Sequence, residues 1–63
     1  MRVYNGWVLR IGYVDFVVAG SQKLRGVQSY VLRATHGVRR ISRPALLAGL
    51  HDGSIQYVNS IAS

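Results

Sequence analysis

The chain has no cysteine, and this absence limits its possible folds more than any other feature of the sequence. Disulfides and thiolate metal sites, which stabilise many very small domains, are therefore excluded. The 63 residues suffice for one domain with one modest core. Hydrophobic residues make up 49% of the chain, which indicates a folded protein rather than a disordered one. We predict a single small domain over residues 1–63, supported by self-association or by a host complex.

The first third of the chain has the pattern of β-strands. Residues 7–11 alternate with a period of two, as in a strand with one buried face. Residues 13–18 continue in strand-forming side chains. Gly12 lies between them and marks either a bulge in one long strand or a turn between two strands. Asn5-Gly6 is a favoured hairpin dipeptide, but only four residues precede it, so any hairpin there is short.

The rest of the chain predicts a loop, a turn and three more strands. Residues 20–26 have a glycine at each end and polar residues between, which is typical of a loop. His36-Gly37 is a plausible turn, because it separates two strand-like segments that would pair as a hairpin. The three strands are expected at residues 27–35, 38–41 and 54–61.

One helix is indicated, and it begins after Ser42. A serine hydroxyl accepts a free backbone N–H of the first turn, and Pro44 is tolerated there because it has no N–H to satisfy. Gly53 favours the left-handed conformation that ends a helix. Gly49 costs about 1 kcal/mol relative to alanine, and either permits a close approach or is simply tolerated. The apolar stripe consists of Leu46, Leu47 and Leu50.

Together these patterns predict an α+β fold. A small antiparallel sheet of four to five strands is joined by one short helix, about residues 43–51, before the last strand. The helix lies on one face of the sheet and buries its leucines. The residues expected mostly in the core are Phe16, Val31, Leu46, Leu47, Leu50 and Ile55.

Catalysis is not expected, because the acid–base material is sparse. The only adjacent titratable pair, His51-Asp52, falls at the end of the predicted helix, where a histidine complements the helix dipole. Two histidines without cysteine make a poor metal set. Phosphate-loop and dinucleotide glycine patterns are absent. We predict a protein that is not an enzyme and that needs no metal or cofactor.

The charge balance points to a polyanionic partner. Eight basic residues face two acidic ones, for a formal net charge of +6, although arginine-rich codon usage gives a similar composition. Arginine and helix N-terminal amides both bind phosphate. Because side chains alternate along a strand, Arg39 and Arg40 should point to opposite faces, and only one of them can share a face with Arg33. The predicted backbone-binding residues are Arg33, Arg39, Arg40, Arg43, Lys23 and Arg25.

The six aromatic residues are expected in the core or at an interface more often than as stacking platforms. Trp7 lies near the N-terminus and is the main candidate for a partner or dimer contact, together with Tyr4 and Tyr57.

These features predict a non-catalytic nucleic-acid-binding module, a DNA-binding homodimer that uses an arginine cluster around a helix N-terminus. The helix-turn-helix class is excluded, because only one helix is indicated. The alternative is a small phage-type inhibitor or adaptor that docks on an acidic surface of a host protein complex. Protein–protein interfaces are rich in arginine and aromatic residues and poor in lysine, as this chain is. A third possibility is a structural subunit that is stable only in a larger assembly.

The sequence also predicts a cytoplasmic protein without membrane contact. No stretch approaches the roughly 20 apolar residues of a membrane-spanning helix. Arg10 and Asp15 interrupt the apolar run that a signal peptide would need.

Overall fold

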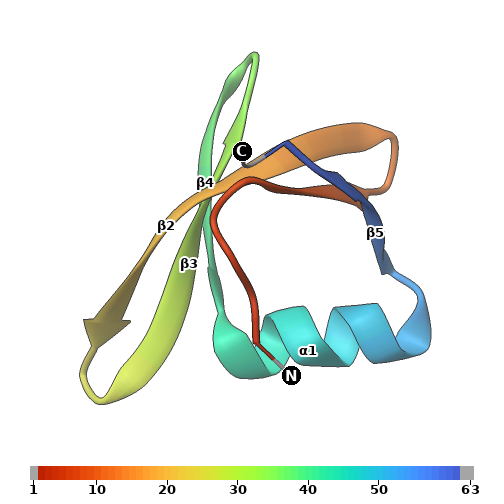
Figure 1. Cartoon of the computed structure of the whole chain (residues 1–63). Helices are drawn as coiled ribbons and strands as arrows, with labels where there is room; N and C mark the ends of the chain where they lie inside the picture. The colour runs from red at the N-terminus through yellow and green to blue at the C-terminus, as the bar shows by residue number, and fades with distance from the viewer. Residues whose placement is uncertain (1, 62–63) are drawn as a thin grey trace.

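The computed structural model describes residues 2–61, which form one five-stranded antiparallel sheet and one helix (Figure 1). The elements are β1 (Trp7–Ile11), β2 (Val14–Leu24), β3 (Val27–Ala34), β4 (Gly37–Ser42), α1 (Arg43–Asp52) and β5 (Ile55–Ser60). The strand order is β4-β3-β2-β1-β5. The first four strands form a meander, and α1 then carries the chain from one edge of the sheet to the other, where β5 pairs with β1. The predicted α+β fold is confirmed.

The turns between the first strands are tight. Gly12 and Tyr13 connect β1 to β2, so Gly12 belongs to a turn and not to a bulge in one strand. Its φ is +65°, and glycine at the first central position is the signature of a type II′ turn. The Asn5-Gly6 pair forms a turn that leads into β1, and no strand precedes it among the described residues. The N–H of Gly6 instead donates to the carbonyl oxygen of Val18 at 2.8 Å.

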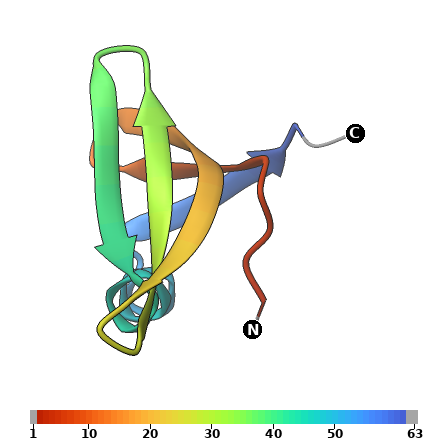
Figure 2. The same cartoon turned by 90° about the vertical axis from the view of Figure 1, so that its left-hand side faces the viewer.

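The prediction of a loop over residues 20–26 is wrong. β2 continues through this segment to Leu24, and only Arg25 and Gly26 form the turn to β3. The polar side chains were misleading, because strand pairing uses backbone groups and leaves exposed positions free to be polar. The register shifts between Val18 and Gly20, which leaves Ala19 as an extra residue in β2. Such a bulge bends a strand, and Figure 2 shows β2 curving strongly across the molecule.

Helix α1 begins and ends as the sequence predicts, one residue longer at its C-terminus. The Oγ of Ser42 accepts a hydrogen bond from the backbone N–H of Ala45 at 3.4 Å. Gly53 has φ +90° and donates its N–H to the carbonyl oxygen of Gly49 at 3.0 Å. Gly49 itself faces Ile55 of β5 so closely that a Cβ there would lie 2.5 Å from the Ile55 Cδ1 atom. The helical glycine therefore permits a close approach of the last strand.

The core lies between the concave face of the curved sheet and α1 (Figures 1 and 2). Of the predicted core residues, Phe16, Leu46 and Ile55 are buried, whereas Leu47 and Leu50 are only partly buried. Val31 does not belong to the core. Strand alternation places it on the outer face, because its neighbour Leu32 is fully buried. The buried hydrophobic residues are Leu9, Phe16, Val18, Tyr30, Leu32, Leu46 and Ile55.

Candidate nucleic-acid interface

Strand β4 lies at one edge of the sheet and carries exposed arginines on both of its faces. Arg39 is paired with Leu32, whose side chain is fully buried, so Arg39 lies on the concave face. Arg40 is paired with Val31 on the outer face. The predicted division of the two arginines between opposite faces is therefore confirmed.

Arg33 and Arg40 share the outer face of the sheet. Arg33 is paired with Val38, which lies two residues before Arg40 on the same strand. This diagonal relation corresponds to a Cα separation of about 7–8 Å, within reach of two long side chains. Val38 lies opposite Arg33 with 63% of its surface exposed. We call Arg33 and Arg40 the outer arginine pair.

Arg43 is the first residue of α1 and is oriented differently from the outer arginine pair. Its Nη1 atom donates a hydrogen bond to the Tyr30 hydroxyl at 2.8 Å, and the contact is partly buried. The residue thus links the start of the helix to β3. The arginines predicted around the helix N-terminus are therefore divided among three directions: the outer face, the concave face and the Tyr30 hydroxyl.

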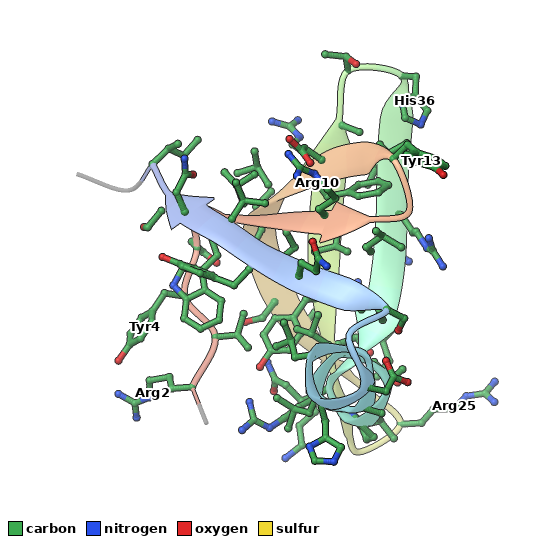
Figure 3. The ribbon with its side chains drawn as sticks, turned by 90° about the vertical axis from the view of Figure 1, so that its right-hand side faces the viewer. Arg2, Tyr4, Arg10, Tyr13, Arg25 and His36 are labelled. Carbon is green, nitrogen blue, oxygen red and sulfur yellow. The ribbon has the colours of Figure 1, made fainter. Side chains whose placement is uncertain are left out.

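Lys23 and Arg25 occupy the far end of the β2–β3 hairpin. Lys23 is paired with Gln28, and Arg25 is in the turn itself. Figure 3 shows Arg25 projecting at the opposite end of the molecule from His36, which lies in the β3–β4 turn. These two cations are thus separated from the β3–β4 turn by the length of the hairpin.

Both acidic residues accept hydrogen bonds from groups close to them in the chain. Asp15 accepts from Arg10 through two hydrogen bonds, Nε to Oδ1 at 2.8 Å and Nη2 to Oδ2 at 3.3 Å. These bonds lower the pKa of Asp15 and raise that of Arg10. Asp52 accepts from the backbone N–H of Ser54 at 2.8 Å, which lowers the pKa of Asp52. Within residues 2–61 the Arg10–Asp15 contact is the one ion pair.

An open pocket of about 410 Å³ lies between the β1–β2 turn and the beginning of β4. Ile11, Val14 and Phe16 supply its apolar side, while His36 and Arg39 come from the β3–β4 turn and β4. The Phe16 and His36 rings meet edge to face, with centroids 6.3 Å apart. Sequence reasoning did not find this pocket, because no local signal links residues that lie twenty positions apart and meet only through the meander.

The three aromatic residues predicted at an interface lie together. The Trp7 ring is 6.1 Å from the Tyr4 ring and 5.0 Å from the Tyr57 ring, measured between centroids. Tyr4 and Tyr57 are about half exposed, while Trp7 also packs against the core. The rings join the N-terminal segment, β1 and β5, and Figure 3 shows Tyr4 beside this end of the sheet. A role in partner binding stays a prediction.

Two features are absent from residues 2–61. No three histidine or acidic residues come together in a group that could hold a metal ion. In the same residues, no helix has the length and apolar character needed to cross a membrane.

Comparison with protein-family models, with curated proteins and with solved structures finds no match.

Proposed function

We propose that this protein is a non-catalytic nucleic-acid-binding module that holds the phosphate backbone along β4. The supporting observation is the distribution of charge. Asp15 is bound by Arg10 and Asp52 by the Ser54 backbone, while β4 and its neighbour present exposed arginines at one edge of the sheet. Because the whole chain has a formal net charge of +6, we expect a polyanion to be attracted to this arginine-rich edge.

Arginine is well suited to this edge. Its planar guanidinium donates two parallel hydrogen bonds to phosphate and keeps its charge at every physiological pH. Arg39 and Arg40 lie on opposite faces of the edge strand β4, and Arg33 of β3 lies beside Arg40 on the outer face. A nucleic-acid backbone that follows the edge of β4 can therefore meet cations from both faces of the sheet. Such binding is dominated by the release of counterions and weakens steeply with salt.

Fluorescence anisotropy with labelled single-stranded and duplex DNA tests this function, at about 50 and 200 mM salt. We expect binding at the lower salt and a marked loss at the higher. Arg40→Gln should weaken binding to all sequences alike and lower the salt slope by about one unit.

Lys23→Gln is the matched control, because it removes one charge from the far end of the β2–β3 hairpin. Equal losses in the two variants would argue against β4 as the site. No binding to either DNA at low salt would refute the proposed function.

A second function, a protein-binding adaptor, is favoured by the open edges of the sheet. β4 and β5 each pair with a strand on one side only, and Val38 is exposed on β4. A partner can add a strand to such an edge, and a second copy can cover it in a symmetric homodimer.

A pull-down from host lysate separates the two functions. A protein partner that is retained after nuclease treatment supports the adaptor, whereas its loss supports nucleic-acid binding. Sedimentation of the purified chain tests the dimer.

A further inference from the structure

We propose that the pocket between the β1–β2 turn and β4 receives one unstacked base of a single-stranded nucleic acid. This inference rests on the proposed function and names the form of nucleic acid that the protein prefers. We call the site the Phe16–Arg39 pocket, after residues from its apolar side and its basic side.

The size and lining of this pocket suit a small flat ligand. Its volume of about 410 Å³ lies within the range of small-molecule sites, and it opens to solvent at the end of the molecule. Ile11, Val14 and Phe16 give it an apolar side. No carboxylate lines it, because Asp15 lies on the outer face with Arg10. An anionic ligand therefore meets no acidic side chain in the lining.

The aromatic groups of the pocket provide a stacking surface. Phe16 is almost fully buried, so its ring forms the floor rather than an open platform. His36 is exposed in the β3–β4 turn and is held edge to face against Phe16. An exposed histidine ring is among the side chains on which unstacked bases lie. The Phe16 contact orients this ring before any ligand arrives.

Arg39 completes the site with a positive charge. Its pairing with Leu32 directs it to the concave face, where it lines the pocket together with His36. The side chain is exposed and can bind the phosphate of the nucleotide whose base occupies the pocket. The pocket thus combines an aromatic surface with a cation that donates hydrogen bonds to phosphate, the combination found at sites that bind single-stranded nucleic acid.

Tyr13 extends this surface outside the pocket. It occupies the tip of the β1–β2 turn, between the pocket-lining residues Ile11 and Val14, and its side chain is fully exposed. Figure 3 shows Tyr13 and His36 toward the same end of the molecule. A fully exposed ring contributes nothing to the core, so it is available to stack on a neighbouring base. Bases in a duplex are already stacked and paired, so both contacts require a single strand.

The test compares single-stranded DNA with duplex DNA of the same sequence, at the same salt, by fluorescence anisotropy. His36→Ala and Tyr13→Ala should each weaken single-strand binding by about fivefold to a hundredfold, and should leave duplex binding unchanged. Arg39→Gln should lower the salt slope for the single strand by about one unit.

Arg40→Gln is the matched control, because it removes the same charge from the next residue on the opposite face. It should affect single strand and duplex alike. Backbone NMR of the unaltered protein with thymidine monophosphate provides a measurement that needs no variant. The amide signals of His36 and Arg39 should shift, while those of Lys23 and Arg25 should not.

The outcomes separate this inference from the proposed function. If the protein binds DNA but His36→Ala affects single-strand and duplex binding equally, or affects neither, the base-binding role of the pocket is overturned. The proposed function would still stand. Failure to bind any nucleic acid would overturn both. Binding of an acidic peptide at the same NMR signals, without a response to the nucleotide, would also overturn the inference.

Discussion

Gly49 is the residue at which local preference and tertiary packing disagree most clearly. Alanine is favoured over glycine inside a helix by about 1 kcal/mol. A Cβ at this position would nevertheless lie 2.5 Å from the Cδ1 atom and 2.6 Å from the Cγ1 atom of Ile55. Overpacking of a core contact typically costs about 1–3 kcal/mol, so we expect Gly49→Ala to lower the free energy of unfolding. Urea denaturation measures the change.

Two variants separate packing from helix propensity at this contact. Ala48→Gly changes an exposed position of the same helix and should lose only the propensity, about 1 kcal/mol. Adding Ile55→Val to Gly49→Ala removes the Cδ1 atom and should recover part of the lost stability. A Gly49→Ala variant more stable than the unaltered chain would show that β5 does not approach the helix this closely.

At the scale of elements, the β2–β3 hairpin turn contains the single described non-glycine residue with positive φ, Arg25 at +52°. Gly26 follows with φ +79°, so both central residues have the left-handed conformation of a type I′ turn. Asparagine adopts this conformation more readily than arginine. We expect Arg25→Asn to increase the free energy of unfolding by about 1 kcal/mol or less, and hence to raise the melting temperature. The contrasting variant Gly26→Ala should lower it, because alanine is strained at that φ.

Helix α1 is held to the sheet mainly by Leu46, which is fully buried. Removing a fully buried leucine side chain costs about 2–5 kcal/mol, so Leu46→Ala should unfold much of a domain of this size. Circular dichroism on heating measures this loss. Leu50→Ala should cost less, because Leu50 is only partly buried at the margin of the core. Equal melting temperatures for the two variants would contradict this arrangement of the helix.

For the whole molecule, stability should fall in acid because of Asp15 and Asp52. Hydrogen bonds in the folded state lower the pKa of both carboxyl groups. A carboxyl group whose pKa is lower in the folded state stabilises the fold at pH values above its ordinary pKa of about 4. This stabilisation is lost as the pH falls through the lower pKa of the folded state. The melting temperature should therefore decrease between neutral pH and about pH 3.

Asp15→Asn provides the comparison for this pH dependence. The variant lacks the titrating carboxylate, so its melting temperature at neutral pH should be lower and should change less on acidification. The effect is modest, because the ion pair with Arg10 is exposed to solvent. An identical pH profile in the variant would mean that the Arg10 contact contributes nothing in solution.

Local chemistry was enough to predict several features of this protein from sequence. The limits of α1 follow from Ser42 and Gly53, because a helix cap depends on residues within one turn. Alternation along a strand was enough to divide Arg39 and Arg40 between two faces. The order of strands and helix likewise follows from periodicity and turn residues, except that the sequence left open whether Gly12 separates two strands.

Other features were decided only by pairing between distant segments. The loop predicted over residues 20–26 is strand, because β3 supplies partners for its backbone. The bulge at Ala19 depends on the register with β3, and the direction of Arg43 depends on where Tyr30 lies. The contact between Phe16 and His36, and hence the pocket, exists only because the meander folds one hairpin against the next. Caps and alternation are properties of neighbouring residues, whereas register and pockets depend on which distant backbones bond, and that is set by the burial of the whole core.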